Sequence, residues 1–243
     1  MKFILKKSFL IFLTLFLFTF VFAKEEKLTF VLGTEGGTFY DGTVVSVGGG
    51  FSHKYELNFF NVNKFNSFNT YAFQATTKNI DLLLKSTCYF LSLPKFTLGF
   101  SGIYHTLFLF NVCFEHDIIG IANLVFGSKE KLFFILDLSL SHKGCVIYSL
   151  SPGKKYLPQG GFGFSMAFKK IILDDWKLLA GLKTYEMFRY PVSLNAILFF
   201  EGFWKINPKF EMSLGLYARF TDLYSMTAFF DYFSVKCGVS YVF

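Results

Sequence analysis

The sequence predicts an all-β fold in which about 12 antiparallel strands (within a range of about 10 to 14) run up and down and close into a transmembrane β-barrel. The chain is strongly apolar, with 53% hydrophobic residues and 37 phenylalanines. After residue 23 it has no run of about 18 or more apolar residues, which excludes membrane-spanning helices. Apolar and polar side chains instead alternate, which is the period of a strand with two different faces. A chain this apolar, without spanning helices, satisfies its backbone in lipid by closing a barrel.

Residues 1–23 predict a secretory signal peptide that is cleaved after Ala23. Three lysines precede an apolar run of about 15 residues, which is shorter than the roughly 20 residues needed to span a bilayer. An uncleaved anchor helix is therefore not expected. The formal net charge of +7 includes these three lysines, so the chain from Lys24 carries +4. It has no Lys/Arg cluster, and nucleic acid is not an expected partner.

The segment 24–42 is polar and rich in glycine at its centre. Its sequence allows either a first strand or a periplasmic arm, and this choice stays open. The transmembrane barrel itself is expected to span residues 43–243.

From residue 43 onward, alternating segments are separated by turn-forming residues. We expect strands at 43–51, 53–62, 65–76, 80–93, 95–114, 118–126, 131–140, 160–170, 176–187, 192–204, 209–220 and 233–243. This gives twelve strands if residues 145–148 belong to a long loop at 141–159. It gives fourteen if they form a strand and the long run 95–114 bends near 102–104. A secreted β-sandwich also alternates, but it would not need apolar stripes on so many strands.

The closing strand ends in a recognisable pattern. Lys236, Gly238, Tyr241 and the terminal Phe243 resemble the C-terminal signal of bacterial outer-membrane β-barrel proteins, including small porin-like barrels of the OmpX or OmpW kind. The resemblance implies an outer-membrane protein of a diderm bacterium, surrounded by outer-membrane lipid. It also implies that the barrel-assembly machinery is a partner that reads these residues.

Turn lengths agree with this family. Counted back from the terminus, short turns at 174–175 and 207–208 fall on the periplasmic side. Longer loops at 141–159, 188–191 and 221–227 fall on the opposite side, and the first of them is the longest. Outer-membrane barrels have the same asymmetry. Trp176, Trp204 and Tyr241 near strand ends fit an interfacial aromatic belt.

One parity of the strands carries charges of both signs, as expected for a wet lumen. The expected lumen-facing charges are Lys131, Asp137, Lys169, Lys177, Lys183, Glu201, Lys209, Glu211, Arg219 and Lys236. Seven of these are cations and three are anions, which predicts a channel with mild anion selectivity. Alternatively, these charges pair across strands and plug a structural barrel.

Three functions are compatible with such a barrel. The first is a porin-like channel for small solutes or ions. The second is a structural barrel that displays the loop 141–159 for adhesion or partner binding. The third, a membrane-embedded hydrolase, has little support, because the neighbours His116 and Asp117, like Ser141 and His142, point to opposite strand faces. We therefore expect no enzyme activity.

No cofactor or metal site is expected either. The sequence has no phosphate-binding loop, and Gly48, Gly49 and Gly50 are interpreted as a strand end or turn. Cysteines stand far apart in the sequence, at Cys88, Cys113, Cys145 and Cys237, without a C-x-x-C pair. They are expected to act as small apolar strand residues rather than as a disulfide or a metal site.

The terminal pattern generates a testable prediction. Phe243→Asp should reduce assembly into the outer membrane more than an equal change in a loop, because the machinery would lose its terminal aromatic residue. The variant should be found degraded or in the periplasm. If it reaches the outer membrane at the wild-type level with heat-modifiable migration on a gel, this interpretation of the C-terminus is wrong.

Overall fold

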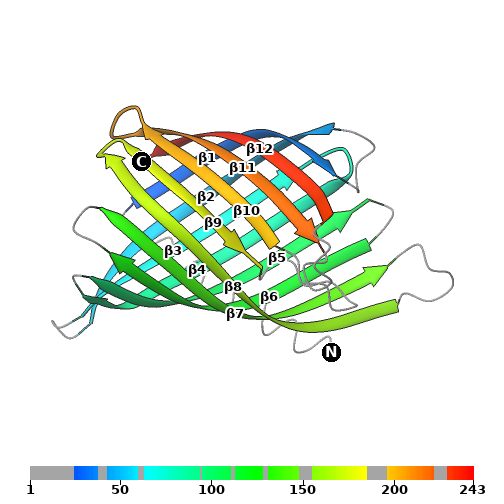
Figure 1. Cartoon of the computed structure of the whole chain (residues 1–243), viewed down its shortest axis with the longest axis horizontal. Helices are drawn as coiled ribbons and strands as arrows, with labels where there is room; N and C mark the ends of the chain where they lie inside the picture. Colours follow the sequence, from blue (N-terminus) through cyan, green and yellow to red (C-terminus); the bar gives the residue numbers. More distant parts are fainter. Residues whose placement is uncertain are drawn as a thin grey trace.

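The computed structural model describes residues 25–37, 43–59, 63–93, 95–110, 113–127, 131–147, 155–184, 196–221 and 229–243. These residues form a closed barrel of twelve antiparallel strands in which each strand pairs with its neighbours in the chain and β12 pairs with β1 (Figure 1). The predicted all-β, up-and-down antiparallel barrel with about 12 strands is confirmed. Among the described residues, no helix is both long and apolar enough to cross a membrane.

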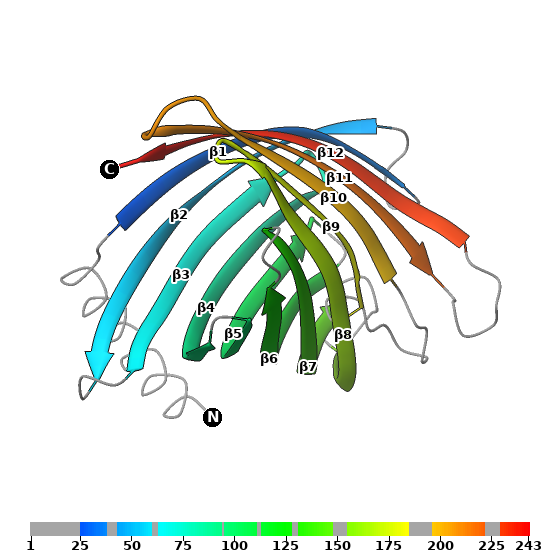
Figure 2. The same ribbon diagram turned by 60° about the vertical axis from the view of Figure 1, so that its left-hand side comes forward.

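The strands occupy most of the described chain. They are β1 (Glu25–Gly37), β2 (Thr43–Phe59), β3 (Asn63–Ala75), β4 (Asn79–Leu93), β5 (Phe96–Leu109), β6 (Cys113–Gly127), β7 (Leu132–Ile147), β8 (Lys155–Leu173), β9 (Trp176–Lys183), β10 (Ala196–Lys205), β11 (Phe210–Thr221) and β12 (Phe229–Val242). Figure 2 shows them curving around a common interior. We call the end of the barrel that holds Glu25 and Phe243 the termini end, and the opposite end the distal end.

The open question about residues 24–42 is answered by β1. Strand β1 lies between β12 and β2, with Thr29 opposite both Ser240 and Gly50, and the two strands β1 and β12 run side by side in both views (Figures 1 and 2). The barrel therefore begins at Glu25 rather than at residue 43. Without β1, one edge each of β2 and β12 would keep unpaired backbone groups, which lipid cannot satisfy.

Three predicted boundaries are wrong. The predicted strand 43–51 and the described part of the predicted strand 53–62 form the single strand β2, which ends at Phe59. This removes one strand from the predicted set, and β1 adds one, so the total stays at twelve. The run 95–114 is not one strand, because β5 ends at Leu109 and β6 starts at Cys113. Leu109 pairs with Cys113 across a tight connection. Apolar residues continue at every second position through this connection, so the sequence pattern gives no sign that one strand ends and another begins.

The third error is the long loop at 141–159. Strands β7 and β8 continue into it, with Ser141 opposite Gly161 and Ile147 opposite Lys155. Pro158 lies within this part of β8, opposite Gly144 of β7. Only residues 148–154 remain between the two strands. The predicted loop 188–191, residues 222–227 of the loop 221–227, and the predicted signal peptide at 1–23 lie outside the described residues.

The two faces of the barrel have opposite character. Large apolar side chains cover the outside, for example Phe30 and Leu32, which are 64% and 59% exposed. The inward parity carries buried polar side chains, among them Glu35, Ser46, Ser101, Asp117, Asn123, Asp137, Ser139, Ser165, Ser234 and Ser240. A barrel in water would reverse this arrangement. An apolar outer face therefore suits lipid. At the termini end, Trp176 stacks on Trp204 with ring centroids 5.5 Å apart, as in an interfacial aromatic belt.

A pair of substitutions on β11 tests these faces. Leu214 is 45% exposed on the outside, whereas its neighbour Ser213 faces inward opposite Gly238 and Phe203. Leu214→Arg should cost roughly 2 to 4 kcal/mol near the membrane midplane, and Ser213→Arg should be nearly neutral because its charge enters the lumen. The check is urea unfolding of both variants refolded into lipid vesicles. Equal midpoints would contradict the assignment of Leu214 to the lipid face.

Candidate functional site

The barrel interior contains a cavity of about 540 Å³ in its distal half. Its wall includes side chains from most strands of the barrel. Charged and amide side chains that line it include Glu35, Gln74, Asp81, His105, Glu115, Asp117, Lys143, Lys183, Glu201, Arg219 and Lys236. This cavity is the candidate solute site.

Glycines on β2 shape one side of the cavity. Gly48 and Gly50 line it, and they lie in the middle of β2 rather than in the strand end or turn that the sequence suggested. A Cβ atom at Gly48 would lie 2.5 Å from the carbonyl oxygen of Phe73, so the close approach of β2 and β3 requires glycine here. The missing side chains also leave room in the lumen.

A polar cluster lies beside these glycines. Glu35 is only 2% exposed, and its carboxylate accepts a hydrogen bond from the Gln74 amide. Lys236 lies 3.7 Å from the same carboxylate and also donates to Gln74. Three strands, β12, β1 and β3, thus contribute to one cluster. A buried carboxylate without such partners would be strongly unfavourable, so the cluster explains how Glu35 is tolerated inside the barrel.

A second cluster is centred on His105. Its Nε2 lies 2.6 Å from Asp81 Oδ1, and its Nδ1 lies 3.3 Å from Asp117 Oδ2. The three residues come from β4, β5 and β6. Sequence reasoning missed this cluster, because it compared His116 only with its chain neighbour Asp117. Both ring nitrogens of His105 face carboxylates, so neither can accept a proton from a serine hydroxyl in the manner of a hydrolase.

A third cluster lies nearer the termini end. The carboxylate of Glu211 forms ion pairs with two lysines: its Oε1 lies 2.5 Å from Lys27 Nζ, and its Oε2 lies 3.5 Å from Lys177 Nζ. Further along β11, the Tyr217 hydroxyl donates a hydrogen bond of 2.8 Å to the carboxylate of Glu201 on β10. Charges on the inward face are thus arranged largely in pairs of opposite sign.

The structure distributes the ten sequence-predicted lumen charges as follows. Lys183, Glu201, Arg219 and Lys236 line the cavity. Asp137, Lys169, Lys177 and Glu211 lie on the same inward parity outside it.

The other two predicted charges lie in turns at the termini end. Lys131 donates to the exposed Asp174 at 2.6 Å, and this hydrogen bond together with the lysine charge lowers the pKa of the Asp174 carboxyl. Lys209 lies over the ring of Tyr241, with its ammonium 6.0 Å from the ring centroid. The expectation that these two lysines line the lumen is therefore corrected.

The residues of the terminal pattern divide by face. Lys236 and Gly238 face inward, whereas Tyr241 lies outside and contacts the rings of Phe210 and Phe243 at 5.0 and 4.9 Å between centroids. The Phe243 amide donates to the Glu26 carbonyl at 3.0 Å, which joins the chain end to β1.

Further inward charges were not identified from the sequence. They are Lys27, Lys54, Lys85, Lys143, Lys205, Glu25, Glu35, Asp81, Glu115 and Asp117. Adding these five cations and five anions to the five cations and three anions that remain from the predicted set gives ten against eight. Among the strand residues whose side chains the structure describes, the predicted surplus of four cations thus falls to two.

Below the cavity, one wall of the barrel is filled. Hydrogen bonds connect Thr87 to Ser101 at 2.7 Å, Ser101 to Asn123 at 2.5 Å and Asn123 to Asp137 at 2.8 Å. The isoleucines Ile103, Ile119 and Ile121 pack together beside this chain with Leu83. The lumen thus contains a packed cluster on β4 to β7 beside a cavity that residues of most strands line.

Comparison with known proteins supports the fold. No protein-family model matches the sequence, and no curated protein matches it. Among solved structures, an outer-membrane channel from Pseudomonas putida F1 is similar with a TM-score of 0.57 at 11% identity, over 91% of this chain and 95% of the channel. The NanC porin is similar with a TM-score of 0.54 at 12% identity, over 88% of this chain and 98% of the porin. At these identities the likeness shows a shared barrel fold.

The packed wall generates a stability prediction. Ile121 is fully buried, whereas Ile118 on the same strand is 56% exposed on the outer face. Ile121→Ala should destabilise the barrel by about 2 to 5 kcal/mol, because it leaves a cavity, and Ile118→Ala should cost less because lipid chains fill the space. Urea unfolding in lipid vesicles measures both. Equal losses would show that the wall at Ile121 is not packed.

Proposed function

We propose that this protein is a porin-like channel for small solutes or ions in the outer membrane of a diderm bacterium. The observation that carries the proposal is the cavity of about 540 Å³, lined by paired charges, inside a closed barrel whose outer face is apolar. A polar interior in an apolar shell is the arrangement by which barrels admit water and solutes across lipid.

The orientation follows from the ends of the chain. An even number of strands returns β12 to the end of the barrel where β1 starts. We place this end in the periplasm, as in bacterial outer-membrane barrels. The distal end, with the cavity, then faces the outside. Cleavage of a signal peptide after Ala23 and reading of the terminal strand by the barrel-assembly machinery belong to the same proposal.

The charge pattern favours weak selectivity. Lumen charges are close to balanced and many are in ion pairs, such as Lys236 with Glu35 and Lys143 with Glu115. We therefore expect the channel to accept small polar or charged solutes, with only a slight preference for anions. We expect no enzyme activity, since both nitrogens of His105 are engaged by carboxylates.

One observation favours a second candidate, a barrel closed to solutes. The packed cluster of Ile103, Ile119 and Ile121 fills part of the lumen, and Ile103 also lines the cavity. Such a barrel would act through its surface loops. That role loses part of its support, because most of the expected loop 141–159 is strand.

Planar-bilayer recordings on the refolded protein decide between the two candidates. We expect ion conductance, and Lys183→Glu on the cavity wall should shift the reversal potential toward cations. The shift should be larger at 0.1 M than at 1 M salt, because the Debye length falls from about 10 Å to about 3 Å. Lys131→Glu at the rim is the matched control and should change little.

Two outcomes would count against the channel. A folded barrel that passes no current at any salt concentration would favour the closed, loop-displaying barrel. Equal shifts for the two lysine variants would mean that the cavity is not on the ion path.

A further inference from the structure

The four cysteines divide by the face of the barrel. Cys88 pairs with Phe100, and Cys237 pairs with Leu32 and Leu214, so both stand among outward apolar residues. Cys113 and Cys145 have the inward parity and lie near the distal ends of β6 and β7. The lumen therefore contains two thiols from neighbouring strands.

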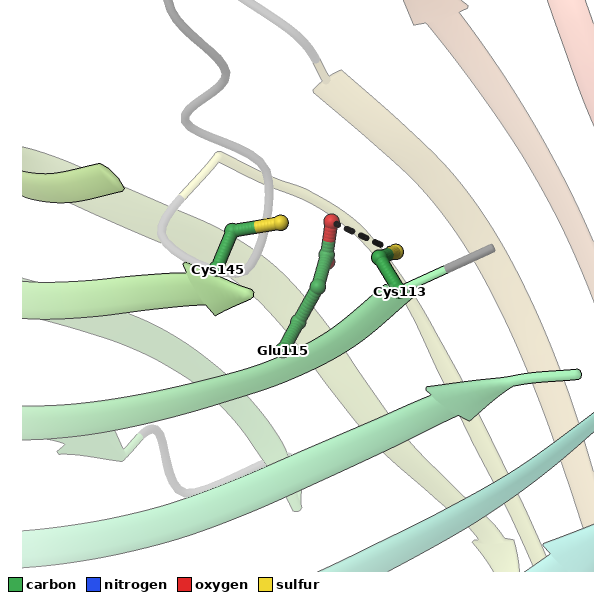
Figure 3. Close-up of side chains that lie close together, drawn as sticks. All are labelled: Cys113, Glu115 and Cys145. Atoms are coloured by element: carbon green, nitrogen blue, oxygen red, sulfur yellow. Dashed lines mark hydrogen bonds between the residues drawn. The ribbon is translucent and has the colours of Figure 1, made fainter. Parts of the chain in front are cut away.

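These two thiols converge on a carboxylate. Glu115 lies two residues after Cys113 on β6 and directly opposite Cys145 on β7. One ligand atom from each of the three residues lies within 4.8 Å of the other two. The Sγ atom of Cys113 is 4.0 Å from Glu115 Oε1, and Figure 3 shows the three side chains pointing toward one another. Both cysteines are free thiols.

We propose that Cys113, Glu115 and Cys145 form a binding site for a zinc-type divalent cation at the distal mouth of the lumen. Two sulfur ligands favour Zn²⁺ and similar thiophilic ions over Mg²⁺ and Ca²⁺, which prefer oxygen. One carboxylate completes a three-residue set of the size that holds an exchangeable Zn²⁺ with a fourth position for water.

The geometry requires only small movements. Tetrahedral Zn²⁺, with bonds of about 2.3 Å to sulfur and about 2.0 Å to oxygen, has ligand atoms about 3.5 to 3.8 Å apart. The present separations, within 4.8 Å, therefore need to shorten by about 1 Å. Rotation of the glutamate and cysteine side chains can supply this, because all three residues lie on adjacent, paired strands.

The local charge also fits a divalent ion. Two thiolates and one carboxylate carry three negative charges, and Lys143 adds one positive charge through its 2.5 Å contact with Glu115 Oε2. A divalent cation would neutralise the remaining two. The lysine contacts Oε2, so Oε1 on the side of Cys113 stays available as a ligand. As each metal–sulfur bond forms, one thiol proton passes to solvent, so binding should strengthen as pH rises.

The site would be open to exchange with solution. Glu115 and Lys143 line the cavity, so the fourth position faces the lumen. A bound ion would also connect the distal ends of β6 and β7 beside the connection between β5 and β6. Binding does not depend on whether the barrel conducts, so it can be tested apart from channel activity.

The test uses tag-free protein, refolded in detergent, reduced and freed of metal with a chelator. Isothermal titration with Zn²⁺ should give one bound ion per chain, and Co²⁺ should produce the thiolate charge-transfer absorption of a sulfur-ligated site. Cys113→Ser and Cys145→Ser should each weaken binding by more than about 100-fold, since loss of an outer partner alone costs 10-fold to 100-fold. Glu115→Gln should weaken it by about 10-fold or more.

Matched controls come from the lipid face. Cys88→Ser and Cys237→Ser should bind Zn²⁺ like the wild type, and heat-modifiable migration should show that all variants fold. Three results would overturn the proposal. The first is that the reduced wild type does not bind Zn²⁺, and the second is that Cys113→Ser binds Zn²⁺ as tightly as the wild type. The third is that the lipid-face controls lose as much Zn²⁺ affinity as the lumen variants. A Cys113–Cys145 disulfide that forms without reductant, combined with no Zn²⁺ binding after reduction, would assign the pair to redox chemistry instead.

Discussion

Backbone hydrogen bonding between β1 and β12 is the interaction on which the rest of the structure depends. Strands surrounded by lipid cannot leave an edge unpaired, because no water is present to satisfy the exposed amides and carbonyls. Residues 27 to 37 of β1 pair with β12 on one side, and β1 also pairs with β2 on the other. Closure then divides every strand into an apolar outer face and an interior face, and the interior must accommodate the polar side chains that the outer face excludes.

The interior solves this problem in two ways. Along β4 to β7, hydrogen-bonded polar side chains and three isoleucines fill the space. On β2, glycines leave space, and charged groups from most of the other strands line it, some of them in pairs. A buried charge without a partner would be costly, and many of the described inward charges are paired or lie beside the cavity. The same pairing explains why we expect a channel with weak rather than strong selectivity.

Side-chain direction decides the chemistry of the interior more than residue type does. Four cysteines of similar sequence context divide into two on the apolar outer face and two that meet Glu115 in the lumen. Of the neighbours His116 and Asp117, only the aspartate faces the lumen, where it meets His105 from another strand. Reactive or metal-binding side chains in this barrel therefore meet from different strands at the same height along the barrel axis. They are not adjacent residues in the chain.

Alternation by itself determined the fold class and the inward parity of eight predicted lumen charges, because side chains on a strand change face at every residue. Alternation does not encode the level of a residue along the barrel axis. That level depends on where each strand turns and how it pairs, which is why β1, the connection after Leu109 and the extension of β7 to Ile147 became visible only in the tertiary structure. It is also why the cluster of Asp81, His105 and Asp117 and the cluster of Cys113, Glu115 and Cys145 were not predictable: each requires the pairing register of neighbouring strands, which barrel closure sets over the whole chain.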